Sequence, residues 1–447
     1  MTSGTDATQR PAVALLNLGC RVNRVELDDI ALELEALGCR IVKPEEASLI
    51  VVNTCAVTGE AEKKCRKAIR RASSLPHKPT VLSCGCMAAL FADTTANLAE
   101  NVLVEIDKTK VPARCRELLG IPDETATALT LPHEAHDAVT PTGRTRPGIK
   151  IQDGCNNRCS FCIVWKARGS SRSLEPEQVL ERVVQAQERG AQEVVLTGIN
   201  LGHYQARSSD GSSRDLAALV RLILDKTDIG RVRLSSVEPP ECTEDLVQAM
   251  ADGGERVAAF LHLPLQAGCD TTLERMRRLY RVADYERVVD TIRTHIPDLA
   301  LACDLIVGFP GESDADFEES RRFCEHMNFA NMHIFRYSSR PGTWAATAPN
   351  QVSPQLLDER SQMMHELARR SRQNYVSSRV GVEELVCVER RGRASTGGLI
   401  ETLVDDSLSV GSLVRVTPHT SVNSGLVLDA RSTGTQSGVS SETADGR

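Results

Sequence analysis

The stretch GIKIQDGCNNRCSFC, residues 148–162, places three cysteines directly after a strand-like apolar segment. Cys155, Cys159 and Cys162 follow a C-x3-C-x2-C spacing, and no fourth cysteine lies nearby in the sequence. A structural zinc site takes four protein ligands, and a ferredoxin-type site also brings a fourth cysteine. A four-iron cluster held by three thiolates leaves one iron free for a substrate or cofactor. The spacing therefore predicts an iron–sulfur cluster with one open coordination position.

After this stretch, apolar strands and amphipathic helices alternate. Strand candidates are 148–152, 193–197, 231–237, 258–265, 299–308 and 331–337, with helical patterns around 176–189, 214–226, 243–251, 284–295 and 314–327. Six repeats are fewer than the eight of a closed barrel, so we predict a partial (βα)6 barrel over residues 148–375. In such folds the functional side chains follow the carboxyl ends of the strands.

Three earlier apolar runs, at 12–19, 48–55 and 79–86, predict a parallel sheet with helices on both faces, in an N-terminal α/β domain over residues 11–121. The proline-rich residues 122–147 lack apolar periodicity and indicate a linker. Short β-like segments over 378–430 favour a small β-barrel of the kind that binds oligonucleotides. The polar tail, 431–447, is expected to be disordered. The fold class is therefore α/β, with a small β domain at the end.

A second set of cysteines stands at the ends of the three early strands: Cys20, Cys55 and Cys86. Neighbouring parallel strands lie about 4.8 Å apart, so these thiols can converge on one cluster. Cys84 lies in the same turn as Cys86 and remains an alternative ligand, although strand alternation points it to the other face. We interpret the remaining cysteines as core packing.

Composition narrows the class of protein. A chain of 447 residues predicts several domains, and 15 cysteines without a secretory signal pattern argue against a secreted disulfide scaffold. No apolar run reaches the length of a bilayer-spanning helix, so we expect a cytoplasmic protein without a membrane partner. The net charge of −7 does not favour global attraction to nucleic acid, but residues 62–71, EKKCRKAIRR, form a local basic segment.

The two cysteine sets, with NLGCRVN (17–23), NTCAVTGEAEKKCRKAIRRA (53–72), TGINLG (197–202) and FRYSSRPGTWAA (335–346), resemble the radical S-adenosylmethionine (SAM) methylthiotransferases. The resemblance implies two [4Fe-4S] clusters, SAM and a C-terminal TRAM domain. Cys155, Cys159 and Cys162 would hold the catalytic, SAM-cleaving cluster, and Cys20, Cys55 and Cys86 an auxiliary cluster. Trp165 departs from the family, which usually has proline there.

Short motifs, Ala167–Gly169, Arg172–Ser173 and TGINLG, resemble the branch that acts on N6-threonylcarbamoyladenosine in tRNA. The implied activity is conversion of this nucleoside, next to the anticodon, to its 2-methylthio derivative. The implied partners are the tRNA anticodon stem-loop and a one-electron donor such as flavodoxin or ferredoxin. Alternatives are a methylthiotransferase for isopentenyladenosine in tRNA or for a ribosomal-protein aspartate, and a non-enzymatic iron–sulfur electron carrier or sensor.

Further site candidates follow from strand ends and charge. Expected SAM contacts are Thr197, Gly198, Ser235, Glu238, Gly308, Gly311 and Glu312. Expected contacts to phosphate or to the threonylcarbamoyl carboxylate are Lys63, Lys64, Arg66, Arg70, Arg71, Arg336, Tyr337 and Arg340. His262 and Gln266 are weaker substrate candidates, and Asp304, inside an apolar strand, should have a polar partner. Since no aromatic residue follows Tyr375, RNA contact in the β domain would depend on Arg379, Arg390, Arg391, Arg393 and Arg415.

Overall fold

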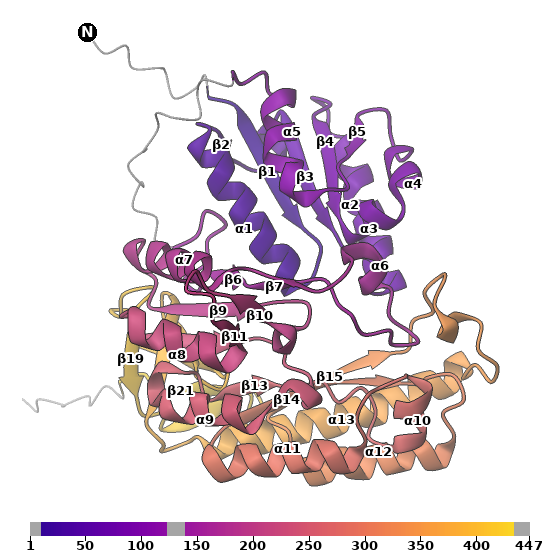
Figure 1. Cartoon of the computed structure of the whole chain (residues 1–447), viewed down its shortest axis with the longest axis vertical. Coiled ribbons are helices and arrows are strands. Elements are labelled where there is room, and N and C mark those ends of the chain that lie inside the picture. Colours follow the sequence, from indigo (N-terminus) through magenta and orange to yellow (C-terminus); the bar gives the residue numbers. More distant parts are fainter. Residues whose placement is uncertain (1–9, 123–138, 433–447) are drawn as a thin grey trace, which may run out of the picture.

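The computed structural model describes residues 10–122 and 139–432. Its first group of elements is a parallel sheet with the strand order β2-β1-β3-β4-β5 (Figure 1). The strands are β1 (Ala12–Asn17), β2 (Arg40–Ile41), β3 (Leu49–Thr54), β4 (Thr80–Gly85) and β5 (Val102–Val104). Every residue of β3 is buried, as a central strand covered on both faces requires. The predicted N-terminal parallel sheet is confirmed.

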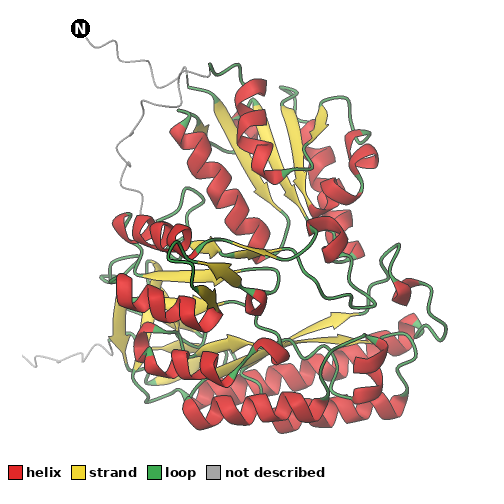
Figure 2. Ribbon diagram, viewed as in Figure 1, coloured by secondary structure: helices red, strands yellow, loops and turns green. Residues whose placement is uncertain are grey.

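Helices cover both faces of this sheet (Figure 2). One apolar cluster joins the sheet to α1 (Arg21–Ala36) and α5 (Val111–Leu118), and the other joins it to α2 (Gly59–Ser73) and α3 (Cys86–Leu90). A further short helix, α4 (Ala92–Ala96), precedes β5. The carboxyl ends of β1, β3 and β4 all point toward the second group of elements, so the residues that follow these strands lie between the two groups.

The second group is an arc of six parallel strands. One sheet contains β6 (Gly148–Lys150), β9 (Glu193–Thr197) and β12 (Arg231–Leu234), and the other contains β13 (Phe260–His262), β14 (Ala300–Val307) and β15 (Asn331–Arg336). Bridges between residues 232 and 257 and between 236 and 262 join the two sheets. All six predicted strands are present, in an open arrangement.

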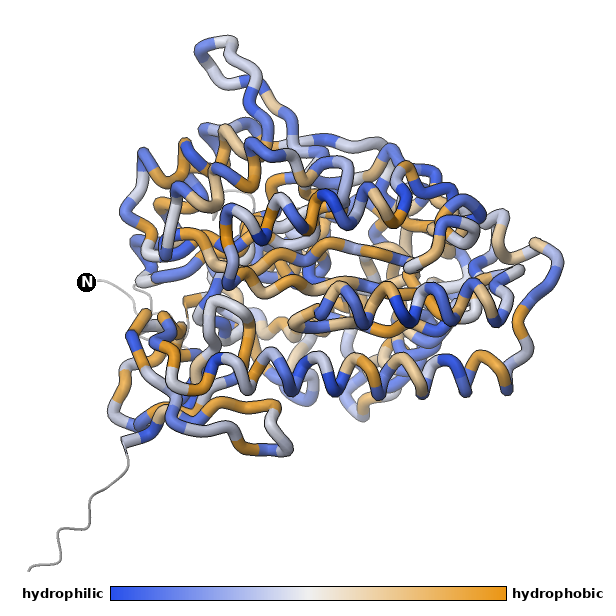
Figure 3. Tube along the Cα trace, turned by 90° about the horizontal axis from the view of Figure 1, so that it is seen from below, coloured by the Kyte–Doolittle hydropathy of each residue, from blue (hydrophilic) through white to orange (hydrophobic). Residues whose placement is uncertain are grey.

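One large apolar core joins the outer face of this arc to its helices, α7 (Pro176–Glu188), α8 (Leu216–Lys226), α9 (Glu244–Asp252), α11 (Val282–His295) and α12 (Asp314–Met327). Figure 3 shows hydrophobic strands in the middle, beside helices whose hydropathy alternates along their length. Short elements fill the loops: β7 (Gln152–Asp153), α6 (Val164–Arg168), β8 (Arg172–Ser173), β10 (Gln205–Arg207), β11 (Ser213–Asp215) and α10 (Asp270–Arg275).

The helix α13 (Pro354–Ser378) was not among the predicted elements. Its start carries an ordinary signal, since the Ser353 hydroxyl accepts a hydrogen bond from the amide of Leu356 and Pro354 is the first helical residue. The helix packs against β15 and α12 and leads to the C-terminal sheet. It therefore supports the last strand of the arc.

The C-terminal region forms a six-stranded sheet, in the order β19-β16-β17-β18-β21-β20, which confirms the predicted β structure but not its closure into a barrel. The strands are β16 (Glu384–Arg390), β17 (Arg393–Thr396), β18 (Glu401–Leu403), β19 (Leu413–Val416), β20 (Thr420–Val422) and β21 (Val427–Asp429). Within the described residues, no pairing of β19 with β20 closes this sheet. The sheet contacts the arc directly, because the Arg231 and Arg233 guanidiniums donate to the carbonyls of Leu385 and Gly397, both at 2.6 Å.

Most of the predicted linker and nearly all of the predicted disordered tail lie outside the described residues. In residues 139–147, the Thr142 hydroxyl and the Arg144 guanidinium both bond to Asp28 of α1. Of the helices in 10–122 and 139–432, none combines the length and the apolar character needed to cross a membrane.

Candidate active site

The loop of Cys155, Cys159 and Cys162 joins β7 to α6 and is held by backbone bonds. The Ser160 amide donates to the Met276 carbonyl at 3.1 Å, and the Ser160 hydroxyl donates to the Arg275 carbonyl at 2.7 Å. The three thiols are half-buried. Burial raises the pKa of each thiol, that of Cys162 to about 12, because a buried thiolate loses its solvation.

A buried cation stands against this loop. Arg278 donates to the Cys159 sulfur at 3.1 Å and pairs with Glu238, one of the predicted SAM contacts. Burial raises the pKa of Glu238, and the Arg278 charge opposes that rise. Arg278 was missed by the sequence reasoning, because it is distant in sequence and belongs to no spacing motif. Glu238 thus lies beside the cysteine loop, with part of its hydrogen-bonding capacity already used by Arg278.

The thiol geometry fits a cluster better than a single ion. All six cysteines belong to the described residues. In each set of three, at least two sulfur atoms are more than 4.8 Å apart. Thiolates around one zinc ion, each about 2.3 Å from it, would lie within about 4 Å of each other. A four-iron cluster binds its thiolates on separate irons and so holds them farther apart. Neither set is therefore arranged to hold a single zinc ion, in agreement with the prediction that each serves a cluster.

Polar atoms without partners mark the strand ends beside the loop. The Ser235 hydroxyl and both amide atoms of Asn200 are buried and have no hydrogen-bond partner within the described residues. Such atoms are rare unless a ligand or water satisfies them. Thr197 is buried at the same edge, and a Cβ on Gly198 would come within 2.9 Å of the Gln152 side-chain oxygen. These strand ends thus offer hydrogen-bonding atoms and close backbone approach to a small polar ligand such as SAM.

The turn after β14 contains the last three of the predicted SAM contacts. Gly308 and Gly311 have positive φ angles, and the space beside them is filled by Leu357 and Arg275. The Glu312 carboxylate accepts from the Gly308 amide at 3.1 Å and pairs with the buried Arg360 at 2.7 Å. These glycines are therefore explained by turn geometry and packing, and their contact with SAM stays a prediction.

The second cysteine set surrounds the ends of β1, β3 and β4. Asn17 pairs in register with Asn53, and Asn53 pairs with Cys84, so the three strands end side by side. Burial raises the pKa of Cys55 to about 11, with smaller upward contributions from Cys20 and Cys86, which places the three thiols close together. The predicted convergence at one edge is therefore observed.

Two other cysteines near this edge are distinguished by the structure. Cys84 belongs to the apolar cluster under α1 and α5, whereas Cys86 lies on the opposite face of the sheet. Strand alternation therefore predicted the direction of Cys84 correctly. Cys65 of α2 lies beside Cys55, since its sulfur accepts from the Cys55 amide at 3.3 Å. The sequence predicts core packing for Cys65. Its place in the basic segment of residues 62–71 was the only sequence feature that set it apart from the other packing cysteines.

A buried polar network joins the two cysteine sets. The Cys20 thiol donates to Asn23 Oδ1 at 3.2 Å, and the same oxygen accepts from Arg168 at 2.9 Å. Arg168 also binds Glu26 of α1 at 2.8 Å and Asp153 at 2.9 Å, just before the cysteine loop. Burial lowers the pKa of Arg168, but Cys86, Glu26 and Asp153 raise it well above its ordinary value. Arg168 therefore connects α1, which follows Cys20, to Asp153, which precedes the cysteine loop, and it is held there by the two carboxylates.

Polar side chains also line the inner face of the arc. His262 bonds to the Ser236 hydroxyl at 2.7 Å and to Asp304 at 3.0 Å, which is the polar partner expected for that carboxylate. His333 of β15 approaches the same group, with ligand atoms of His262, Asp304 and His333 within 4.8 Å of one another. Gln266 has a left-handed backbone, and its backbone bridges to Leu305. The interior of the arc thus carries a polar group of side chains around His262.

The predicted substrate arginines after β15 are already paired. Arg340 is buried against Glu62 of α2 at 2.5 Å, so it joins the two α/β groups. Arg336 pairs with Asp358 and stays half-exposed. The Tyr337 hydroxyl is buried without a partner in the described residues. The contacts of Arg336 and Arg340 with substrate stay predictions, and each of the two side chains already has a carboxylate partner.

The basic helix α2 presents an exposed cationic face. Lys63, Arg70 and Arg71 are exposed and form no ion pair with any described residue, whereas Lys64 pairs with Glu60 at 2.7 Å and Arg66 with Glu62 at 2.5 Å. The five C-terminal arginines predicted for RNA contact all form ion pairs with acidic side chains; they are Arg379, Arg390, Arg391, Arg393 and Arg415.

Trp165, which departs from the family pattern, lies at the end of the cysteine loop. The Arg158 guanidinium stands over its ring, 4.5 Å from the ring centre.

Comparison with known proteins gives two regions of similarity to protein families. Residues 149–324 match the radical SAM superfamily, and residues 12–105 match "Uncharacterized protein family UPF0004". Among solved structures, the radical SAM methyltransferase TsrM of Kitasatospora setae aligns with a TM-score of 0.53 at 16% identity, over 76% of this chain and 74% of that one. This likeness shows a shared fold.

Curated relatives are more similar in sequence. A threonylcarbamoyladenosine tRNA methylthiotransferase MtaB of Thermotoga maritima is 34% identical over 84% of this chain and 86% of its own length. A protein of the same name from Chlamydia pneumoniae is 35% identical over 88% and 90%. A tRNA-2-methylthio-N(6)-dimethylallyladenosine synthase of Novosphingobium aromaticivorans is 31% identical over 88% and 90%.

The open arc of parallel strands and its three-cysteine loop define a radical SAM enzyme. The auxiliary cysteines and the similarity over most of the chain then specify the family. This chain belongs to the radical SAM methylthiotransferases, whose cofactors are SAM and two [4Fe-4S] clusters.

Proposed function

We propose that this protein is a tRNA methylthiotransferase that converts N6-threonylcarbamoyladenosine, next to the anticodon, to 2-methylthio-N6-threonylcarbamoyladenosine. The observation that carries the proposal is the placement of two three-thiol sets at facing strand ends, joined through Arg168. The names of the T. maritima and C. pneumoniae relatives support this nucleoside over the alternatives.

Each cofactor has a proposed set of side chains. Cys155, Cys159 and Cys162 hold one cluster, and Cys20, Cys55 and Cys86 hold the other. SAM and the clusters, when bound, supply the methyl group, the sulfur and the radical that activates the adenine C2–H bond, which is not acidic enough for a general base. Thr197, Gly198, Ser235 and Glu238 are the proposed SAM contacts.

The protein's own part is binding, orientation and exclusion of water. Arg278 holds Glu238 against the Cys159 loop, so that the carboxylate is oriented before SAM arrives. Arg168 fixes the distance between the thiol sets. An anticodon-loop base is already single-stranded, so its entry into the arc needs no duplex opening. Proposed RNA phosphate contacts are Lys63, Lys64, Arg66, Arg70 and Arg71 on α2.

The remaining partners belong to the same proposal. A one-electron donor, such as flavodoxin or ferredoxin, reduces the cluster of Cys155, Cys159 and Cys162. A tRNA substrate would also place the protein in the cytoplasm.

Nucleoside analysis of tRNA from a deletion strain tests the substrate. Loss of 2-methylthio-N6-threonylcarbamoyladenosine, with accumulation of the unthiolated nucleoside, is the expected result. An unchanged tRNA profile would instead point to the ribosomal-protein substrate. Loss of the isopentenyl derivative alone would assign the other tRNA branch. A reduced protein that yields no 5′-deoxyadenosine from SAM would favour the electron carrier.

A further inference from the structure

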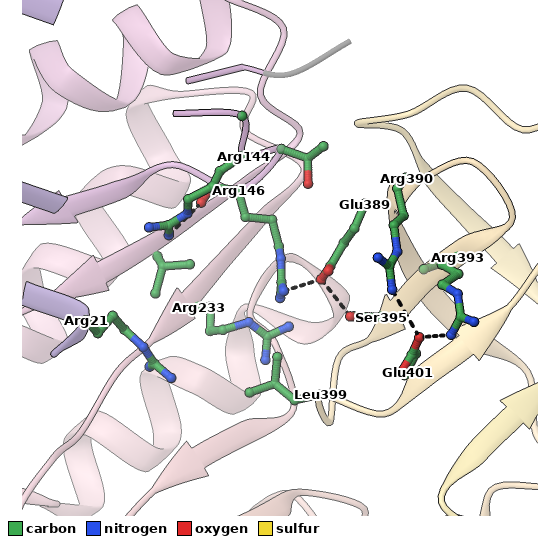
Figure 4. A pocket seen from close by; sticks show the side chains of 14 residues that line it. Arg21, Arg144, Arg146, Arg233, Glu389, Arg390, Arg393, Ser395, Leu399 and Glu401 are labelled. Atoms are coloured by element: carbon green, nitrogen blue, oxygen red, sulfur yellow. Dashed lines mark hydrogen bonds and ion pairs between the residues drawn. The ribbon is translucent and has the colours of Figure 1, made fainter. Parts of the chain in front are cut away.

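A cavity of about 600 Å³ lies where the N-terminal domain, the arc and the C-terminal sheet meet (Figure 4). Its walls come from the start of α1, residues 143–146, strands β9 and β12, and residues 389–401 of the C-terminal sheet. The lining carries two glutamates, Glu389 and Glu401, and six arginines: Arg21, Arg144, Arg146, Arg233, Arg390 and Arg393. Such an excess of guanidinium groups makes the cavity suited to an anion.

Five of these arginines are already engaged. Arg144 pairs with Asp28, Arg146 with Glu389, and Arg233 with Glu193. Arg390 and Arg393 share the Glu401 carboxylate. Their geometry is therefore fixed by neighbouring carboxylates, and they form a positive wall rather than free donors.

Arg21 is different from the other five. Arg21 is exposed to solvent, and its guanidinium forms no hydrogen bond and no ion pair with any described residue, so all of its donors are free to bind an acceptor. It is the first residue of α1, and Figure 4 shows its side chain extending from that helix toward Arg233. The cavity thus contains one uncommitted fork of N–H donors.

The surroundings of Arg21 connect the cavity to the reaction site. Arg21 directly follows Cys20, a proposed auxiliary-cluster ligand. Cys20 and Asp304 both lie within electrostatic range of the Arg21 guanidinium. Arg21 also acts on the pKa of His333, in the polar interior of the arc. A group bound by Arg21 would therefore lie near the sulfur-donating cysteines.

We propose that Arg21 binds the carboxylate of the N6-threonylcarbamoyl group and thereby selects this nucleoside over adenosines with uncharged N6 substituents. The inference rests on the proposed function and names the residue that reads the substrate. A planar guanidinium matches a planar carboxylate through two parallel hydrogen bonds. The modified N6 and the C2 atom to be thiolated belong to the same purine ring, so an anchor beside Cys20 acts close to the site of sulfur insertion.

A backbone phosphate is the rival ligand for Arg21, and the two are separable by chemistry. The test uses three synthetic anticodon stem-loops of one sequence, which carry N6-threonylcarbamoyladenosine, its threonyl methyl ester, or unmodified adenosine. The ester removes the negative charge and keeps the phosphates unchanged. Affinities are measured by fluorescence anisotropy with anaerobically reconstituted wild-type, Arg21→Gln, Arg21→Lys and Arg24→Gln proteins.

Arg24→Gln is the matched control, because Arg24 is exposed one turn along the same helix and does not line the cavity. Arg21→Gln should weaken binding of the threonylcarbamoyl RNA by about 10- to 100-fold and leave the ester and unmodified RNAs unchanged. Arg21→Lys should recover part of the loss, since it restores the charge but not the fork. Equal iron content in all four proteins shows that the clusters are intact.

Equal weakening of all three RNAs, with a smaller salt dependence, would assign Arg21 to a phosphate and overturn the proposal. No change in any affinity would also overturn it. In both of these cases the proposed function would still hold if the wild-type protein thiolates the threonylcarbamoyl RNA. A wild-type protein that does not discriminate among the RNAs and thiolates none of them would refute both.

Discussion

Replacement of Arg168 by methionine should destabilise the protein strongly, because it leaves two buried carboxylates without their shared partner. The Arg168 side chain is 4% exposed and binds Glu26 and Asp153 at 2.8 and 2.9 Å. Breaking one partner of a buried ion pair typically costs about 3–5 kcal/mol. Lys108 and Lys150 still contact Glu26, so we expect the lower end, about 3 kcal/mol.

Arg172 offers a matched control for Arg168. It binds the other oxygen of the same Asp153 carboxylate at 2.8 Å, but its side chain is 62% exposed. Arg172→Met should therefore cost about 0–1 kcal/mol, because solvent screens an exposed pair. Anaerobic urea unfolding of the cluster-loaded proteins, followed by circular dichroism, gives both free energies. Equal losses within about 1 kcal/mol would refute the argument that burial of the Arg168 network stabilises the contact between the thiol sets.

Two further predictions concern Glu193 and the auxiliary cysteines. Burial raises the pKa of Glu193, but the charges of Arg233, Arg231 and a third arginine outweigh it and lower the pKa from 4.5 to about 2. The ionised Glu193 carboxylate therefore contributes its full stability above about pH 4.5, and this contribution is lost as the pH falls through about 2. Glu193→Gln should remove about 3 kcal/mol of the pH-dependent part of the unfolding free energy, measured by urea titrations at several pH values. An acid dependence as steep as that of the wild type would contradict this assignment. Cys86→Ser should halve the iron content of anaerobically purified protein. Cys84→Ser, on the opposite face of the sheet, should leave the iron content unchanged. A loss of iron in the Cys84 variant alone would make Cys84, and not Cys86, the cluster ligand.

The repeating pattern of the chain could be read from sequence almost completely. Strand β9 has the predicted bounds, and helix α12 does as well, because continuous apolar runs and 3.6-residue periodicity are local properties. The small elements β2 and β5 and the long helix α13 were missed. The first two are edge strands of two and three residues, too short to show a periodic pattern, and α13 follows the last predicted repeat. The small barrel predicted for the C-terminal region is confirmed only as a β-sheet, since sheet closure depends on long-range pairing that strand patterns do not encode.

What the sequence determined by itself was the chemistry: six cysteines at strand ends, an open-coordinated cluster and the succession of strands and helices, because spacing along the chain controls each of them. What only the tertiary structure decided was the choice among charged side chains. Arg340 pairs with Glu62, Arg168 pairs with Glu26 between the thiol sets, and Arg21 lines a cavity without a partner among the described residues. Those outcomes depend on which carboxylates approach from distant segments, and electrostatic pairing acts through space rather than along the chain.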